Sequence, residues 1–465
     1  MKKILLVQVR GGVPLEVAVP RLAACGETYV LAFAAPPAAA EEEWRPCCAG
    51  VLGRWQEELH GEALVDAIVA EAASLGADAV LCTSEYVLLA TALAAERLGL
   101  PGPGTGARAA RDKRRMREVW SDAGVPVPRF RRVGSRADLM TALGELEPPL
   151  LLKPAWGAGG IGQAIVSGPE ELDDAWERVG GALERSASYS LADWYVTNPA
   201  RDLLAEEVVH GTTEGWYDRP GYGDFLSVEG IVAGGAYHPI SITARTPTIP
   251  PFTELTCLAP CVLSEPLQRR IEAIARKAVD ALGLDTCATH TEIKLAPDGR
   301  LFVLETAARL GGGVITQVVE SVFGVDLIGL LAKELLGERP RYPERMLVPG
   351  QGAAADIAIL ASGATGSPWR TLPPWNVRRV DWRRLVSPGT TVRVVEGLTM
   401  PDGAPMPRFT PGSGLSACAG MLLVTAADPE TLLADCASIY DGLESVLAEL
   451  GDERLDLRRL ERSPA

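Results

Sequence analysis

The sequence predicts a chain of mixed α/β and α+β class, with an open α/β domain at the N-terminus, two α+β subdomains and a small β-rich C-terminal module. Over residues 1–108, apolar runs alternate with helical patterns, as expected of an open sheet. Strand-like runs dominate from about residue 150 to residue 305, and short strands with many prolines and glycines follow from about residue 350. A chain of 465 residues also has the length of roughly three domains.

The N-terminal elements have clear signals. Residues 4–9 form a continuous apolar run that ends at Gly11 and Gly12, which is typical of a buried parallel strand entering a turn. Further strands are expected at residues 29–33 and 79–82, and helices at residues 61–74 and 86–98. Ligands bind beyond the carboxyl ends of such strands, where Glu85 falls. A carboxylate that favours a helix N-terminus is the alternative explanation for Glu85.

The middle and C-terminal elements follow the same reasoning. Residues 107–123 form a charged helical pattern that Gly124 ends. Strands are expected at residues 150–153, 161–166, 203–209 and 225–232, with helices at residues 170–179 and 267–282 and a last helix near residues 429–450. The predicted domains are residues 1–108, residues 109–345 with a lid subdomain over about residues 125–205, and residues 346–465.

Composition narrows the class of protein. A net charge of -15 argues against nucleic-acid binding, which needs a basic face. No apolar run reaches bilayer length, and no cleavage site for a secretory signal follows the N-terminus. Nine irregularly spaced cysteines indicate reduced thiols, and four histidines make a histidine-rich metal site improbable. We therefore expect a cytoplasmic protein with small-molecule substrates and no membrane partner.

A predicted hairpin carries two opposed carboxylates. Asp298-Gly299 is a two-residue turn signal, because both residues tolerate positive φ. Folding the chain about this turn pairs Pro297 with Arg300, Ile293 with Leu304 and Glu292 with Glu305. Like charges that face each other destabilise a sheet unless a cation lies between them. Two carboxylates suit Mg²⁺, which commonly shares its coordination with substrate phosphates, so the pair predicts a nucleotide site.

A glycine-rich loop offers a second phosphate-binding element. The segment that begins at Lys153 places a lysine at a strand end, and the loop after it contains Gly157, Ala158, Gly159, Gly160 and Gly162. Clustered glycines allow backbone N–H groups to approach phosphate oxygens, and the lysine adds a positive charge. The loop is neither a Walker A motif nor a dinucleotide fingerprint. The alternative explanation is an ordinary glycine-rich hairpin tip. The lysine beside the loop and the carboxylate pair Glu292 and Glu305 favour phosphate binding over this alternative.

Three more segments are candidate ligand contacts. Lys113 lies in a basic helix and could anchor a phosphate, although a solvated charged face is the usual explanation. Glu206, Glu207 and Val209 end an apolar strand and could hold an adenine amine and ring nitrogen. Arg309 follows Glu305 by four residues and precedes Gly311 and Gly312, which suits a bidentate grip on carboxylate or phosphoryl oxygens. A surface arginine before a flexible linker is the alternative.

Together, these motifs resemble the ATP-grasp superfamily over roughly residues 1–340. The residues that carry the resemblance are Asp112-Lys113, Lys153-Pro154 with its glycine loop, Glu206-Glu207 with Gly211, the pair Glu292 and Glu305, and Arg309-Leu-Gly-Gly. The resemblance implies two α+β subdomains that bind ATP between them. It also implies activation of a carboxylate as an acylphosphate, which an amine then attacks.

The resemblance implies a role for each matched residue. Lys113 and Lys153 would contact ATP phosphates, and residues 157–162 would close over them. Glu206 with the backbone of Glu207 and Val209 would hold adenine, and Glu292 and Glu305 would ligate Mg²⁺. Arg309, with Gly311 and Gly312 beside it, would bind substrate and stabilise the acylphosphate and the tetrahedral intermediate, with Lys153 as a second catalytic residue.

The chain departs from the family pattern at two places. Many members have Glu-x-Asn-x-Arg, but here Ala307 replaces the asparagine, so that a water or phosphate oxygen must complete the metal shell. This variant is more similar to the L-amino-acid ligase branch than to biotin carboxylases. An insertion after Gly211 leaves Asp224 and Glu214 as candidates for the ribose contact. Glu254 could receive the amino group of a substrate or could be a solvent-exposed loop residue.

The sequence therefore predicts an ATP-dependent carboxylate–amine ligase that joins an amino-acid-like carboxylate to an amine, giving an amide or dipeptide with ADP and phosphate. ATP and Mg²⁺ are the expected cofactors, and a homodimer is possible. A purine-biosynthesis-type ligase that uses formate or bicarbonate is the alternative among enzymes. A catalytically inactive ATP-binding module is the alternative from another class, and Ala307 keeps it open.

Overall fold

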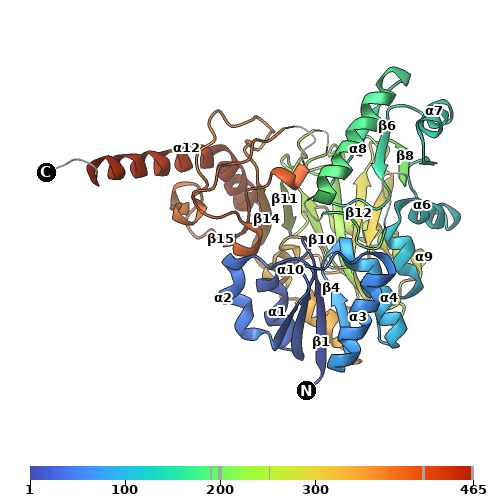
Figure 1. Ribbon diagram of the computed structural model, residues 1–465. Coiled ribbons are helices and arrows are strands. Elements are labelled where there is room, and N and C mark those ends of the chain that lie inside the picture. Colours follow the sequence, from blue (N-terminus) through green and yellow to red (C-terminus); the bar gives the residue numbers. More distant parts are fainter. Residues whose placement is uncertain (189–190, 197–201, 251, 411–413, 462–465) are drawn as a thin grey trace.

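The computed structural model describes residues 1–188, 191–196, 202–250, 252–410 and 414–461. In this part of the chain the strands form three sheets of four, four and eight strands (Figure 1). The first is parallel, and the other two are antiparallel. The predicted mixture of α/β and α+β structure is confirmed.

The N-terminal sheet has the strand order β3-β2-β1-β4. Its strands are β1 (Lys3–Gln8), β2 (Glu27–Ala32), β3 (Gly50–Gly53) and β4 (Ala79–Cys82), and its main helices are α1 (Leu15–Ala23), α3 (Gly61–Leu75) and α4 (Leu88–Leu98). Ile4 and Leu6 of β1 pack with α1, whereas Leu5 and Val7 pack with α3. The apolar run is continuous because both faces of β1 are covered. β3 was missed in the sequence, because a four-residue strand bounded by glycines shows no periodicity.

The second sheet belongs to the predicted lid region. Its order is β5-β8-β6-β7, with β5 (Phe130–Val133), β6 (Leu150–Pro154), β7 (Ala164–Val166) and β8 (Leu203–Glu207). Helices α7 (Arg136–Glu145) and α8 (Leu172–Ser188) pack against one face of this sheet, around a small core that contains Leu139, Leu152 and Val179. β6 therefore delivers Lys153 to the end of the sheet from which the glycine-rich loop leaves.

The eight-stranded sheet runs in the order β13-β12-β9-β10-β11-β14-β16-β15. Its strands are β9 (Phe225–Ala233), β10 (Ala236–Arg245), β11 (Thr256–Ala259), β12 (Cys287–Leu295), β13 (Leu301–Ala307), β14 (Ala353–Ile359), β15 (Thr391–Val395) and β16 (Gly420–Ala426). Because β11 pairs with β14, the strands on the two sides of the predicted boundary at residue 346 share one sheet. The predicted domain limits otherwise stay predictions.

Helices cover this central sheet. α9 (Glu265–Leu282) packs against β10, β12 and β13, and α12 (Pro429–Glu461) packs against β14 and β16. α10 (Ile315–Phe323) and α11 (Leu327–Leu335) follow the hairpin strand β13. Among the described residues no single helix has the length and apolarity to cross a membrane; α10 and α11 do so only as a pair, which is bent by 104°.

The carboxylate hairpin differs from its predicted register in two places. Ala296 N–H donates to Arg300 O, so the loop has three residues, and Gly299 closes it with φ of 78°. A bulge at Leu304 then shifts the pairing by one residue. Ile293 consequently faces Val303 and not Leu304, so that predicted pair is wrong, as is the two-residue turn. The two shifts cancel, and Glu292 faces Glu305 as predicted.

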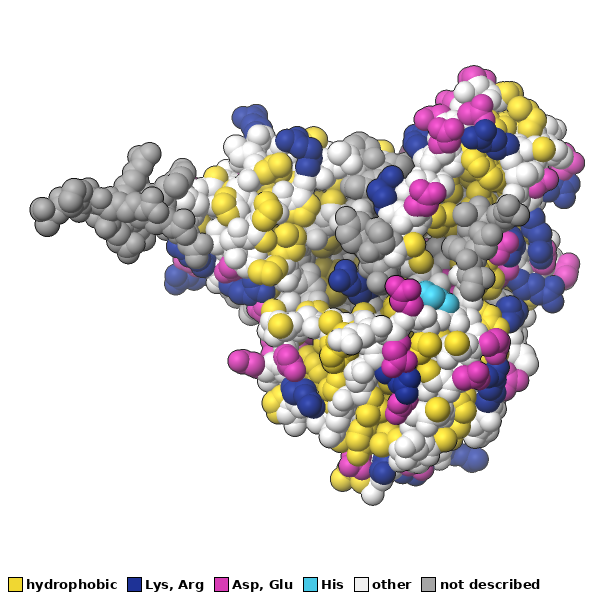
Figure 2. Space-filling view, viewed as in Figure 1, with side chains coloured by type: hydrophobic (Ala, Val, Ile, Leu, Met, Phe, Trp, Pro, Cys, Tyr) yellow, Lys and Arg dark blue, Asp and Glu magenta, His cyan; other side chains and the backbone are white. Residues whose placement is uncertain are grey.

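The predicted charged helix over residues 107–123 is two helices. α5 (Ala107–Arg111) ends where Asp112 is extended, and α6 (Lys113–Asp122) begins there, with the Asp112 carboxylate accepting the N–H of Arg114. This break places Lys113 in the first turn of α6, where its side chain is buried. On the face in Figure 2, basic and acidic side chains are interspersed among the described residues.

Candidate active site

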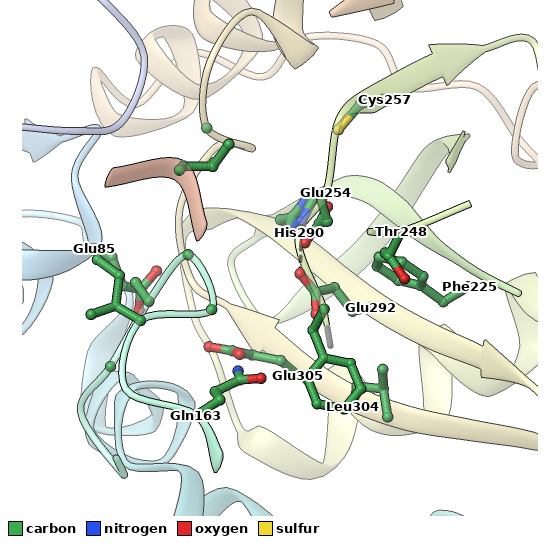
Figure 3. A pocket seen from close by; sticks show the side chains of 18 of the residues that line it. Glu85, Gln163, Phe225, Thr248, Glu254, Cys257, His290, Glu292, Leu304 and Glu305 are labelled. Atoms are coloured by element: carbon green, nitrogen blue, oxygen red, sulfur yellow. Dashed lines mark ion pairs between the residues drawn. The ribbon is translucent and has the colours of Figure 1, made fainter. Parts of the chain in front are cut away.

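A cavity of about 500 Å³ lies where the three sheets meet (Figure 3). The N-terminal sheet contributes Gly11, Gly12 and Glu85, which follow β1 and β4, as expected for the carboxyl ends of parallel strands. The predicted site residues in its wall are Lys113, Lys153, Gly157, Ala158, Gly159, Gly160, Glu206, Glu207, Val209, Glu254, Glu292, Glu305, Arg309 and Gly312. The cavity wall does not include Gly162, Asp224 or Gly311.

The two opposed carboxylates point into this cavity from neighbouring strands (Figure 3). Glu305 Oε1 lies 2.8 Å from Lys113 Nζ, and Glu292 Oε1 lies 3.6 Å from His290 Nε2. Burial would raise the pKa of Glu292, but the hydrogen bond and charge of His290 outweigh it and lower that pKa to about 2. Both carboxylates are thus held beside positive groups, and Glu292 remains ionised.

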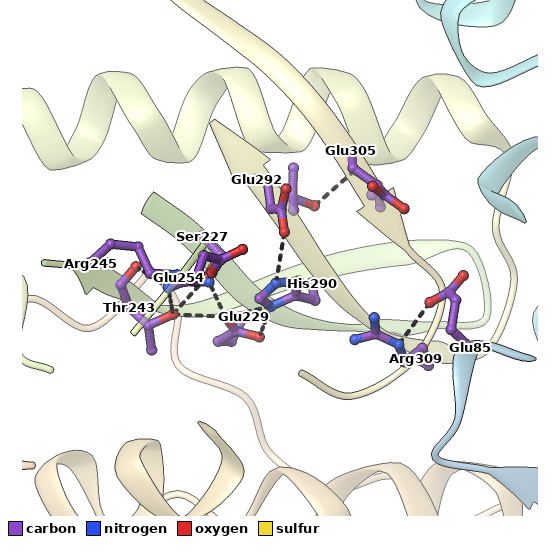
Figure 4. Close-up of polar contacts among 12 residues, drawn as sticks. Glu85, Ser227, Glu229, Thr243, Arg245, Glu254, His290, Glu292, Glu305 and Arg309 are labelled. Atoms are coloured by element: carbon purple, nitrogen blue, oxygen red, sulfur yellow. Dashed lines mark hydrogen bonds and ion pairs between the residues drawn. The ribbon is translucent and has the colours of Figure 1, made fainter. Parts of the chain in front are cut away.

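A buried chain of hydrogen bonds orients His290 (Figure 4). Its Nδ1 lies 2.9 Å from Oε1 of Glu229, which also accepts hydrogen bonds from the hydroxyls of Ser227 and Thr243. Burial favours the neutral imidazole, but the Glu229 carboxylate outweighs it and raises the pKa of His290 to about 9. Glu229 was missed, although it is the single acid in the apolar run of β9, because it meets His290 only through strand pairing.

The cavity fits a hard divalent cation only in part. Two carboxylates face each other, but Ala307 adds no oxygen, and the described residues contain no group of three His, Cys, Asp or Glu side chains suited to a metal. Mg²⁺ commonly binds proteins through one or two carboxylates and takes its other ligands from water and substrate phosphates. Glu292 and Glu305 therefore fit a phosphate-bound Mg²⁺ and not a permanent structural metal.

The basic groups for a phosphate chain lie beside the carboxylates. Lys113 Nζ donates to Gly157 O over 2.8 Å, which ties α6 to the glycine loop. In that loop, Gly159, Gly160 and Gly162 have φ of 62°, 70° and 72°, which side chains rarely adopt. Burial lowers the pKa of Lys153 despite its ion pair with Glu206. Lys153 is therefore buried just before a loop in which three residues have backbone conformations that favour glycine.

Glu206 lies in the cavity wall with two basic partners, and its adenine contact stays a prediction. The side chain is 3% exposed and is engaged by Lys153 and by Arg117, whose Nη2 lies 3.0 Å from Glu206 Oε2. Burial raises the pKa of Glu206, but Arg117 and Lys153 outweigh it and the pKa is lowered. The Glu206 carboxylate thus positions Lys153, and Glu206, Glu207 and Val209 all lie in the cavity wall.

Arg309 faces the N-terminal sheet (Figure 4). Its Nε lies 2.7 Å from Oε2 of Glu85, which is 4% exposed. Burial opposes ionisation of Glu85, yet Arg309 and then Arg111 lower its pKa below the ordinary range. Arg111 in turn pairs with Asp193 over 2.9 Å. Glu85 therefore links the end of β4 to Arg309, which follows the carboxylate pair Glu292 and Glu305. This contact favours a place for Glu85 in the ligand site over a role at a helix N-terminus.

The remaining candidates are distributed around this centre. Glu254 lies in the wall but forms an ion pair with the buried Arg245, with 2.8 Å between Oε2 and Nε. Asp224 pairs with Lys294 Nζ at 2.7 Å, and only Lys294 reaches the cavity. Asp356 also lines the cavity and was missed, although a single acid in the apolar run from Ala353 to Leu360 was a visible signal.

Comparisons with known proteins identify relatives of this sequence. Over 298 residues the chain is 39% identical to an alanine–anticapsin ligase of Bacillus subtilis strain 168, which covers 63% of this chain. The chain spans 62% of that relative's length. A D-alanine–D-alanine ligase of Pseudomonas fluorescens is 36% identical over 132 residues, which are 26% of this chain and 40% of the relative. No family model matches the sequence.

Solved structures show the same fold. An L-amino acid ligase from Bacillus licheniformis aligns with a TM-score of 0.66 at 22% identity, covering 96% of this chain and 98% of the other. A biotin carboxylase domain from Hydrogenobacter thermophilus, solved with MgADP and bicarbonate, aligns with a TM-score of 0.63 at 19% identity, covering 91% and 86%. At these identities the likeness establishes the architecture.

Proposed function

Because the chain belongs to the ATP-grasp superfamily, we propose that it is an ATP-dependent carboxylate–amine ligase that acts on amino acids. The observation that carries this proposal is the cavity in which the pair Glu292 and Glu305 lies beside Lys113, Lys153 and Arg309. Two acids for a metal and two lysines for phosphates suit a nucleoside triphosphate. The relatives named alanine–anticapsin ligase support an amino acid as one substrate.

Several residues would hold the nucleotide. The base would lie among apolar wall residues contributed by two sheets, Leu151, Val208, Val209 and Leu304. The glycine loop and the two lysines would contact the phosphates. Mg²⁺, held by Glu292 and Glu305, would neutralise phosphate charge. The ribose contact has weaker support, because Asp224 is engaged by Lys294 and lies outside the cavity wall.

The reaction would proceed in two steps, a phosphoryl transfer and an acyl transfer. A carboxylate oxygen of the first substrate attacks the γ-phosphorus, the bond to the bridging oxygen breaks, and ADP leaves. An amine then attacks the carbonyl carbon of the acylphosphate, the C–O bond breaks, phosphate leaves, and the nitrogen loses a proton. Negative charge increases on the oxygens near Arg309 and Lys153 in both steps, and fixed cations stabilise such charge. No protein nucleophile is required.

The first test measures phosphate release with ATP, Mg²⁺ and pairs of amino acids, combined with mass detection of the product. We expect phosphate release that needs amino acids and a product with the mass of an amide. The change Glu305→Ala is expected to abolish ATP turnover, whereas Glu265→Ala, at a surface position on α9 outside the cavity wall, is expected to retain it. Normal ADP release from Glu305→Ala would contradict the metal assignment.

The same assay separates the other candidate functions. Phosphate release with formate or bicarbonate and no amino acid would indicate a ligase of the purine-biosynthesis type. ATP binding without phosphate release across a broad amino-acid panel would indicate an inactive nucleotide-binding module. The cytoplasmic location and the homodimer stay predictions.

A further inference from the structure

Asp356 lies at the end of the cavity formed by the C-terminal strands. It is on β14, where it pairs with Cys257 of β11, and both side chains line the cavity. Asp356 is 3% exposed. The cavity wall also contains the apolar residues Ile315, Ala358 and Met421, and the charged wall residues that act on Asp356 are Arg245 and Glu254, which are paired with each other. The charged groups that act on this acid therefore already neutralise each other.

The cavity wall contains seven acidic side chains, of which six have a basic partner. The pairs are Glu85 with Arg309, Glu206 with Lys153, Glu207 with Arg129, Glu254 with Arg245, Glu292 with His290 and Glu305 with Lys113. Asp356 is the seventh, and among the described residues its Oδ1 has no hydrogen-bond partner. Its Oδ2 accepts the backbone N–H of Val314 over 2.7 Å. One carboxylate oxygen of this cavity-wall residue is thus buried without a hydrogen-bond partner.

Among the described residues no lysine, arginine or histidine forms an ion pair with Asp356, although the charge of Arg245 acts to lower the pKa of that carboxyl. Arg245 pairs with Cys257, which pairs with Asp356, so the backbones of Arg245 and Asp356 lie two strands apart, or about 10 Å at the usual spacing. Its guanidinium is already bound to Glu254. Burial consequently raises the pKa of Asp356 to about 7. A buried carboxylate without a partner is costly, and a bound cation would remove much of that cost.

The segment of residues 311–313, which follows Arg309, lies against Asp356 and connects it to the end of the cavity where Arg309 lies. Gly313 has φ of 60°, and a Cβ there would lie 2.4 Å from Asp356 Oδ2. No side chain therefore separates the loop from the acid. A substrate that presents its carboxyl end to Arg309 could extend along Gly312 and place a nitrogen against Asp356.

We propose that Asp356 binds a cationic nitrogen of an amino-acid substrate, either the α-ammonium group or a basic side chain. This inference rests on the proposed function. It transfers to Asp356 the role that the sequence suggested for Glu254, because Arg245 already neutralises Glu254. The free Oδ1 accepts the nitrogen, while Oδ2 keeps its bond to the backbone of Val314.

The test compares binding of four probes to the full chain with Mg²⁺ and a non-hydrolysable ATP analogue, by calorimetry. L-Alanine and L-lactate differ in the α-ammonium group, and L-lysine and L-norleucine differ in the side-chain cation. We expect Asp356→Asn to weaken binding of the member of one pair that carries the tested ammonium group at least tenfold and to leave the member that lacks it within twofold. The pair affected identifies which nitrogen is bound.

Asparagine at position 356 retains an acceptor for Val314 N–H, so the substitution removes the charge and not the structural bond. Asp435→Asn is the matched control: Asp435 is also 3% exposed, lies outside the cavity wall, and accepts hydrogen bonds from Ser387 and Thr390. We expect it to bind every probe as the wild type does. Equal weakening of all probes by Asp356→Asn, unchanged binding, or a wild type with no preference for the probes that carry the tested ammonium group would overturn the inference.

Phosphate release separates this inference from the proposed function. If the wild type releases phosphate with amino acids but Asp356→Asn does not discriminate the probes, only the role of Asp356 fails. If the wild type releases none with any amino-acid pair, the proposed function fails.

Discussion

Two buried acids in one cavity have opposite pKa shifts because their partners differ. Burial raises both values, but His290 lowers the pKa of Glu292 to about 2, whereas the pKa of Asp356 rises to about 7. The sequence predicted that Glu292 faces Glu305, since one hairpin contains both. The sequence gave no basis for the partner of Glu254, because Arg245 ends β10 and Glu254 lies in the segment before β11, and their contact depends on the path of the chain between them.

The raised pKa of Asp356 predicts a stability that falls as pH rises. Between its usual pKa of about 3.9 and the folded value of about 7, the folded protein keeps a proton that the unfolded chain has released. This residue therefore contributes a slope of up to about 1.4 kcal/mol per pH unit, with stability lost as pH increases. Asp356→Asn is expected to gain stability relative to the wild type between pH 5 and pH 8 in urea unfolding of the ligand-free protein. The same pH dependence in both proteins would contradict this.

Gly313 is predicted to be required for activity because a side chain there would collide with Asp356, in addition to straining the backbone. Gly313→Ala would bring a Cβ to 2.4 Å from Asp356 Oδ2, whereas Gly337→Ala has a φ of 75° but nothing within 4 Å. Both substitutions should cost about 1–2 kcal/mol in backbone strain. Only Gly313→Ala is expected to lose phosphate release, by tenfold or more. Equal activity in the two variants would show that the contact with Asp356 is unimportant.

At the scale of elements, the β12–β13 hairpin explains how an imperfect prediction placed the carboxylates correctly. The turn has one more residue than its sequence signal indicated, and the bulge at Leu304 compensates. The bulge also lets Leu304 and Glu305, which are consecutive, both line the cavity. Alternation along a regular strand would send them to opposite faces, so the sequence pattern could not predict this.

Deletion of Leu304 is predicted to keep the carboxylate pair. Without the bulge, Val303 would still face Ile293 and Glu305 would still face Glu292 in regular pairing. The lost contact is apolar and worth about 1–2 kcal/mol, so the KM for ATP is expected to rise about tenfold with little change in kcat. Leu304→Ala is the control and is expected to behave similarly. A deletion variant that folds but has no turnover would contradict the assigned register.

At the scale of the whole molecule, three sheets must meet before the site exists. Apolar runs and glycine turns predicted most individual strands, including β1, β4 and β6, because each signal is local. Sequence could not predict that β14 and β16 extend the central sheet, since their pairing joins segments far apart in the chain. Asp356 reaches the cavity only through that pairing.

The contact between Glu85 and Arg309 joins two of these sheets, and its loss is predicted to affect catalysis. Glu85→Gln keeps the shape of the side chain but removes the charge that orients Arg309. We expect kcat to fall tenfold or more while the KM for ATP stays within twofold. Glu62→Gln, at an exposed ion pair with Arg97, is the control and should be near wild type. A rise in the KM for ATP without a fall in kcat would contradict the positioning role.

The most direct test of the proposed chemistry follows an oxygen atom from substrate to phosphate. An amino acid with ¹⁸O in its carboxylate is supplied with ATP, Mg²⁺ and an amine substrate, and the released phosphate is examined by mass spectrometry. Activation as an acylphosphate predicts one ¹⁸O in each phosphate formed and one retained in the amide. Phosphate without ¹⁸O, released together with the amide, would contradict the account.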